Sequence, residues 1–145
     1  MIAAVAVVVY SETGTTLAVA RRIARALADT GISAELITVG QGAKTADLSD
    51  YRAAVLGAPV RGFDLAPPMA DFLSRSAGLG GLRVYCFVTQ AFPFKAWGAT
   101  QALARMASIC RAKGAEPRLL DAVSRTRGYE RAAAKLADDI LHAFA

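Results

Sequence analysis

The sequence is poor in the residues that carry metal and thiol chemistry. It has two cysteines and one histidine, and no CxxC pair or Cys/His metal-binding spacing occurs. Cys86 and Cys110 lie in separate apolar stretches, which is typical of reduced core residues in a cytosolic protein. We therefore expect a cytoplasmic protein without a metal site, in which neither cysteine is a nucleophile.

The N-terminus lacks the features of an export signal or a membrane span. Met1–Tyr10 is apolar, but it has no basic leader, no small-residue cleavage pattern and too few residues to cross a bilayer. We interpret it as a buried strand and expect no membrane insertion. A length of 145 residues, with 54% hydrophobic and 20% charged residues, fits one globular domain over residues 1–145.

A block of like charge is absent as well. The formal net charge is +5, but the Lys and Arg residues are spread along several predicted helices. This distribution does not indicate nucleic-acid binding, because a nucleic-acid contact calls for a clustered basic patch. A moderately basic surface affects solubility and the choice of protein partner more than the fold.

Short apolar segments and amphipathic helices alternate along the chain. The run A-V-A-V-V-V-Y is rich in β-branched residues and is typical of a strand buried on both faces. The predicted strands are Ala4–Tyr10, Ala34–Val39, Ala53–Gly57, Arg83–Thr89 and Pro117–Val123. The predicted helices are Thr16–Asp29, about Ala99–Lys113, and two that begin at Pro67 and about Tyr129. This order predicts a parallel sheet with helices on both faces.

Three connections leave the predicted strands at the edge where parallel sheets bind ligands, namely Ser11–Thr16, Ala58–Leu65 and Gln90–Gly98. The first, S-E-T-G-T-T, joins a strand to a helix N-terminus and offers hydroxyls, a glycine and backbone N–H groups, which suit a phosphate. It contains no Lys or Arg, so amides and hydroxyls would have to hold the anion. A plain Ser/Thr helix cap is the alternative.

S-E-T-G-T-T resembles the loop with which flavodoxins hold the phosphate of flavin mononucleotide (FMN), Thr/Ser-x-Thr-Gly-x-Thr after the first strand. L-G-A-P-V-R-G-F and T-Q-A-F-P-F-K-A-W-G are similar to the two loops that flank the flavin ring in this family. The resemblance implies a flavodoxin-like three-layer α/β sandwich. It also implies a five-stranded parallel sheet in the order 2-1-3-4-5 and one non-covalently bound FMN.

The resemblance assigns roles to residues of all three loops. Those implied to hold the phosphate are Ser11, Glu12 through its backbone, Thr13, Gly14, Thr15 and Thr16. Those implied to line one side of the ring are Ala58, Pro59, Val60, Arg61 and Gly62, and those on the other side are Thr89, Gln90, Phe92 and Pro93. Gly62 falls where many flavodoxins have a glycine whose carbonyl can turn towards flavin N5, which glycine permits because it tolerates positive φ.

The sequence departs from the family pattern in two respects. Arg61 stands where many flavodoxins have Trp, Tyr or Met, which leaves Phe63, Phe92, Phe94 and Trp97 as candidates to stack on the ring. Arg61 can equally be a solvated surface charge. The chain is basic where classical flavodoxins are strongly acidic, so the basic redox partners usual for the family are not implied.

Other folds of similar topology fail on specific residues. Leu56–Gly57 stands where a receiver domain needs Asp, and no Cys follows the first strand as a low-molecular-weight tyrosine phosphatase requires. The P-loop pattern G-x4-G-K-[ST] and the dinucleotide pattern G-x-G-x-x-G are also absent from the first loop.

The predicted function is electron transfer through FMN, with redox partner proteins that the sequence does not identify. No acid, base or nucleophile constellation is present, so an electron carrier is favoured over a self-contained oxidoreductase. The alternatives are a small FMN-dependent NAD(P)H or quinone reductase and an interaction module that has lost FMN. We expect a monomer or weak dimer.

Overall fold

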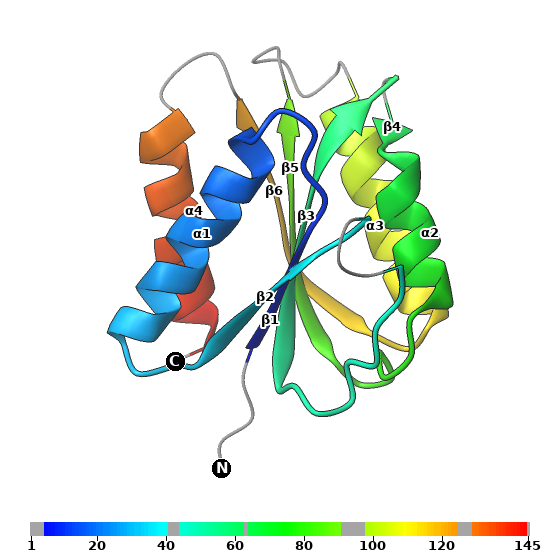
Figure 1. The fold of residues 1–145 in the computed structure, drawn as a ribbon, viewed down its shortest axis with the longest axis horizontal. Helices are drawn as coiled ribbons and strands as arrows, with labels where there is room; N and C mark the ends of the chain where they lie inside the picture. Colours follow the sequence, from blue (N-terminus) through cyan, green and yellow to red (C-terminus); the bar gives the residue numbers. More distant parts are fainter. Residues whose placement is uncertain (1–4, 41–43, 63, 91–97, 125–128, 145) are drawn as a thin grey trace.

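A computed structural model describes residues 5–40, 44–62, 64–90, 98–124 and 129–144. Its centre is a six-stranded sheet whose strands, shown in Figure 1, have the following bounds. They are β1 (Val5–Val9), β2 (Ala34–Thr38), β3 (Ala53–Arg61), β4 (Asp64–Leu65), β5 (Arg83–Gln90) and β6 (Glu116–Ser124). All five residues of β1 are buried, as expected for a β-branched run covered on both faces.

The sheet has the order β2-β1-β3-β5-β6, and these five strands are parallel to their neighbours. Counted along the chain, they have the predicted order 2-1-3-4-5. The sixth strand, β4, is short and antiparallel to β3, with Val60 opposite Leu65 and Arg61 opposite Asp64. The predicted loop Ala58–Leu65 is therefore wrong in part: β3 continues to Arg61 and begins a tight β-hairpin.

Two pairs of helices cover the sheet and complete three layers (Figure 1). One face carries α1 (Thr15–Asp29) and α4 (Tyr129–Phe144), and the other carries α2 (Pro67–Arg75) and α3 (Ala99–Ala112). The helix α1 turns Val19, Ala20, Ile23 and Leu27 into the core, where each is fully buried. None of the described helices is both long enough and apolar enough to cross a membrane.

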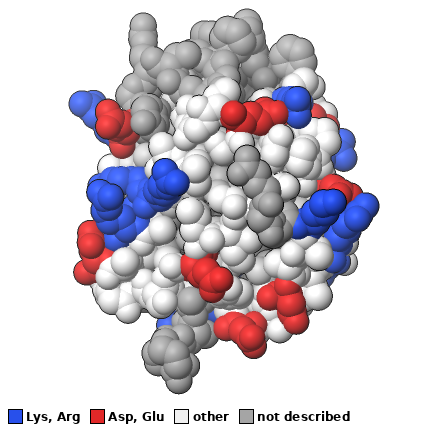
Figure 2. Space-filling view, in the orientation of Figure 1, with Lys and Arg blue, Asp and Glu red and all other residues white. Residues whose placement is uncertain are grey.

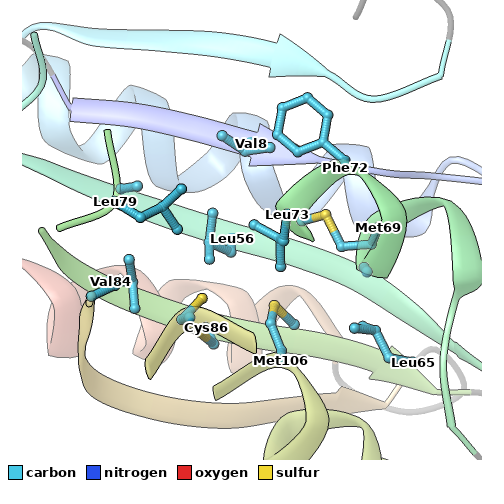
Figure 3. Close-up of a cluster of buried hydrophobic side chains, with 14 of the residues drawn as sticks. Val8, Leu56, Leu65, Met69, Phe72, Leu73, Leu79, Val84, Cys86 and Met106 are labelled. Atoms are coloured by element: carbon cyan, nitrogen blue, oxygen red, sulfur yellow. The ribbon is translucent and has the colours of Figure 1, made fainter. Parts of the chain in front are cut away.

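The sheet separates two clusters of buried side chains. Figure 3 shows the cluster beneath α2 and α3, in which Leu56 and Cys86 of the sheet meet Leu73 and Met106 of the helices. Cys110 belongs to the same cluster, so both cysteines are buried core residues as predicted. A hydrogen bond with Cys110, together with burial, raises the pKa of the Cys86 thiol well above its ordinary value. Cys86 therefore stays protonated at neutral pH and is not a nucleophile.

The cluster beneath α1 and α4 contains the rings of Tyr85 and Phe87. Phe87 is 1% exposed and packs directly over Gly57, its neighbour in the parallel pairing of β3 with β5. A Cβ at Gly57 would overlap three atoms of the Phe87 ring. Gly57 is therefore a packing requirement in the middle of the sheet.

Candidate functional site

The connection between β1 and α1 places the Ser11 hydroxyl at the N-terminus of α1. Gly14 caps α1 in the left-handed region at φ 94, and no side chain caps the helix there. The Ser11 hydroxyl instead accepts hydrogen bonds from the backbone N–H groups of Gly14 at 3.1 Å and Leu17 at 3.3 Å. The first turn of α1 is therefore capped by a serine hydroxyl, as the alternative of a Ser/Thr cap predicts, although Ser11 precedes the N-cap residue Gly14 by three positions. First-turn N–H groups have no intrahelical partner and point to the same end, which suits an anion.

Two predicted site segments are joined by a buried hydrogen bond. The hydroxyls of Thr16, in the first turn of α1, and Thr89, near the end of β5, lie 2.7 Å apart. Thr16 is 2% exposed and Thr89 is 1% exposed. A hydroxyl has one donor hydrogen and two acceptor lone pairs, so each of the two hydroxyls keeps hydrogen-bonding capacity beyond this bond. The bond holds the start of α1 at the carboxyl end of β5 before any ligand is present.

An ion pair connects the same loop to the β3–β4 hairpin. Arg61 Nη1 lies 2.8 Å from Glu12 Oε2, and the Tyr10 hydroxyl lies 3.4 Å from that oxygen. The side chains of Arg61 and Glu12 are 55% and 30% exposed. Arg61 therefore lies beside the proposed phosphate loop, and its charge compensates the carboxylate within that loop.

The other strand of the hairpin is tied to α3. Asp64, opposite Arg61 in the hairpin, accepts hydrogen bonds from Arg105 Nε at 3.0 Å and pairs with Arg105 Nη2 at 2.9 Å. The hydrogen bond from Arg105 is the main cause that lowers the pKa of Asp64 below its ordinary value. Sequence reasoning did not identify Asp64 and Arg105, because they lie 41 positions apart and no local pattern indicates that they approach each other.

Gln90, the last residue of β5, has a buried side-chain oxygen without a hydrogen-bond partner. Its side chain is 5% exposed, and Oε1 is the one buried side-chain oxygen or nitrogen without a hydrogen-bond partner among the described residues. Pro59 pairs with Thr89, so Gln90 lies next to the Val60 end of β3. A buried acceptor without a donor costs about 1–3 kcal/mol. A ligand that brings an N–H or O–H group to Oε1 would remove that cost.

The remaining predicted site residues are placed as follows. Ala58 is fully buried and packs in the α2/α3 core, so it can offer a ligand only its backbone. Gly62 is exposed at the hairpin turn with φ 58, and Val60 is half-buried. Thr13 is exposed, Thr15 is half-buried, and Pro59 is buried. Residues outside the described part of the chain are Phe63, Phe92, Pro93, Phe94 and Trp97.

A hollow of about 350 Å³ opens beside the loop, at the carboxyl ends of β1 and β2. Its walls include Tyr10, Ser11, Leu17 and Thr38. Thr38 was not singled out by the sequence analysis, although the end of the second predicted strand was a signal for this edge. Ser11 thus lies between the hollow and the start of α1.

Comparison with known proteins gives a consistent picture. A family model described as flavodoxin domain matches residues 6–122. A comparison with curated protein sequences finds no significant match.

Several solved structures have the same fold. Oxidised flavodoxin 1 from Bacillus cereus has a TM-score of 0.76 at 17% identity, with 97% of this chain and 98% of that chain covered. A flavodoxin from the domain Archaea has a TM-score of 0.70 at 19% identity, with 94% and 95% covered. Rubredoxin oxygen:oxidoreductase from Desulfovibrio gigas has a TM-score of 0.65 at 15% identity, with 96% of this chain and 35% of that chain covered. The structural likeness establishes the fold, and the family model spans most of the chain, so this chain belongs to the flavodoxin domain family.

Proposed function

We propose that the protein is an electron carrier that binds FMN non-covalently and acts in the cytoplasm. The observation that carries the proposal is that the β1–α1 loop, the β3–β4 hairpin and the end of β5 meet at one edge of the sheet. The Thr16–Thr89 hydrogen bond joins the start of α1 to β5, and the Arg61–Glu12 ion pair joins the hairpin to the loop. FMN supplies reversible electron uptake when bound, and the protein supplies binding, orientation and electrostatics. Both cysteines are buried in the core, and the sequence offers no acid–base constellation, which favours a carrier over a self-contained enzyme.

The phosphate end of FMN fits the loop between β1 and α1. The Ser11 O–H, the Thr13 and Thr15 side chains and the N–H groups of Thr15 and Thr16 at the start of α1 would hold the phosphate. The N–H groups of Gly14 and Leu17 already donate to the Ser11 oxygen. Glu12 would repel a phosphate, but Arg61 at 2.8 Å offsets that charge. The loop itself carries no cation, which suits one terminal phosphate better than a triphosphate with magnesium.

The ring end of FMN fits the hairpin and the end of β5. Gln90 Oε1 needs a donor, and an isoalloxazine carries a ring N–H. The exposed turn at Gly62, with φ 58, leaves its peptide groups accessible from solvent. The hairpin is tied to its neighbours on both sides, by Arg61–Glu12 and by Asp64–Arg105.

Cofactor selectivity tests this proposal. FMN is expected to bind well, riboflavin markedly less well and FAD poorly. Each lost charge-assisted hydrogen bond to the phosphate costs about 1.5–3 kcal/mol. Isothermal titration of the cofactor-free protein with each flavin measures the difference. Equal affinities for FMN and riboflavin would disprove the phosphate assignment, and a colourless protein that binds no flavin would favour an interaction module.

Gln90→Met is expected to shift stability and affinity in opposite directions. Removing the orphaned acceptor should raise the free energy of unfolding of the cofactor-free protein by about 1–3 kcal/mol, because the side-chain volume is nearly kept. FMN affinity should fall roughly tenfold, because one ring hydrogen bond is lost. Urea unfolding and a fluorescence titration provide the two values. A less stable variant would show that Oε1 has a hydrogen-bond partner in the free protein, and unchanged FMN affinity would show that Gln90 does not contact the cofactor.

A further inference from the structure

Three arginines lie close together on the solvent side of α1. Arg21, Arg22 and Arg25 are all exposed, whereas Ile23 in the same stretch is fully buried. Figure 2 shows basic side chains gathered over the middle of this helix. We refer to Arg21, Arg22 and Arg25 as the α1 arginine patch.

The three arginines of the patch have no evident role in stabilising the fold. Within the part of the chain that the structure describes, five ion pairs are present, and none of them includes Arg21, Arg22 or Arg25. Arg21 and Arg25 are four residues apart on a helix, an arrangement that destabilises a helix when the charges are alike. The residues of the last turn of α1, where a cation would complement the helix dipole, include no basic side chain. The three arginines therefore make no ion pair within the described structure.

The patch lies near the candidate cofactor site. The helix α1 begins at Thr15, and its first turn contains Thr16, which contacts β5. Arg21 follows Gly14 by seven residues, a rise of about 10 Å along the helix. The patch therefore lies along the middle of α1, on the same helix whose first turn borders the candidate phosphate loop.

We propose that the α1 arginine patch docks an electron-transfer protein with an acidic surface. This inference rests on the proposed function, since it names the chemistry of the redox partner. The patch extends over about one helical turn, which is small for a nucleic acid, whose binding neutralises many phosphates along a track. Exposed carboxylates border it at Asp29 in α1 and at Glu130 in α4, which lines a hollow together with Arg22. The basic area is therefore small and has acidic borders. A partner with a compact acidic surface fits such an area, because complementary charge steers association.

The probe is an acidic [2Fe–2S] ferredoxin, titrated by calorimetry against the cofactor-free and the FMN-loaded protein. We expect binding at about 20 mM salt that weakens at least tenfold at about 200 mM. The double variant Arg21→Glu/Arg25→Glu should weaken binding at low salt at least tenfold. The matched control is Arg52→Glu/Arg83→Glu, which makes the same change in net charge. Arg52 and Arg83 are exposed and lie at the amino ends of β3 and β5, far from the candidate site, and should change the affinity less than threefold.

Equal losses in the two double variants would overturn the proposal, because net charge alone would then explain binding. Absence of binding by the parent protein at low salt would also overturn it. A duplex DNA that binds as tightly as the ferredoxin, with the same loss in Arg21→Glu/Arg25→Glu, would identify a general polyanion site instead. Ferredoxin binding by a protein that takes up no FMN would preserve the docking surface and refute the electron carrier. The two hypotheses therefore fail separately.

Discussion

Gly57→Val is expected to destabilise the protein by about 3 kcal/mol or more, near the upper end of the cost of overpacking a core. Gly57 pairs with Val9 on one side and Phe87 on the other, so its backbone is fixed within the sheet. A Cβ at this position overlaps the Phe87 ring, and that ring is itself 1% exposed. Because the ring has no empty space to enter, the strands must separate or Phe87 must leave its position. Denaturant unfolding of the cofactor-free protein measures the loss.

Gly80→Ala is the control at an exposed glycine, and it is compared with Gly57→Ala. Gly80 is exposed and does not have a positive φ, and a Cβ at this position would have no neighbouring atom within 4 Å. Its substitution should change the free energy of unfolding by less than about 0.5 kcal/mol. The double variant Gly57→Ala/Phe87→Leu should recover part of the loss of Gly57→Ala alone, since the overlapping ring is removed. Unfolding midpoints that are equal for Gly57→Val and the parent protein would contradict the packing described for this face of the sheet.

Arg61→Glu is expected to weaken FMN binding about tenfold. In the parent protein the Arg61 guanidinium lies 2.8 Å from Glu12, beside the loop that would hold the phosphate. The variant replaces that ion pair by two carboxylates next to a phosphate dianion. Unit charges about 4 Å apart interact by roughly 1 kcal/mol in water and 4 kcal/mol near a protein surface, and the 55% exposure of Arg61 favours the lower value. A fluorescence titration at two ionic strengths measures the affinity, and added salt should reduce the difference.

The same charge reversal should make the reduction potential of bound FMN more negative by tens of millivolts. Reduced FMN tends to carry negative charge on its ring, and about 1.4 kcal/mol corresponds to 59 mV for a one-electron step. Because Glu12 already compensates Arg61, the shift is smaller than for an isolated guanidinium. The control Glu12→Arg/Arg61→Glu keeps one charge of each sign at these positions and should restore FMN affinity. Unchanged affinity and potential in Arg61→Glu would mean that Arg61 acts only as a surface charge.

The sheet and its helices follow from local patterns in the sequence. The Val-rich run of β1, the apolar face of α1 and the regular alternation of strands and helices are enough to define a parallel α/β fold. The extension of β3 to Arg61 could not be obtained in the same way, because Pro59 usually indicates the end of a central strand. Pairing with β4 and the positive φ of Gly62 decide that segment instead.

The sequence predicted which loops form the candidate site, but it did not predict which side chains interact within it. The sequence placed Thr16 and Thr89 in one site, but their direct hydrogen bond depends on how α1 packs against β5, which no local pattern encodes. The partner of Arg61 is similarly a consequence of two loops that meet in space. The unpaired acceptor of Gln90 could be recognised only once its surroundings were known. Residue types suggested the candidate site, and tertiary packing determined which of its atoms remain available.

The buried Thr16–Thr89 bond also affects the entropy of cofactor association. A flexible anion loop loses backbone freedom when it closes on a ligand, and that loss reduces the net affinity. Here the first turn of α1 is fastened to β5 in advance, and the Ser11 hydroxyl holds the N–H groups of Gly14 and Leu17. Folding has therefore already supplied much of the order that the phosphate requires. For the proposed phosphate site, this order would partly offset the lack of a cation within the loop.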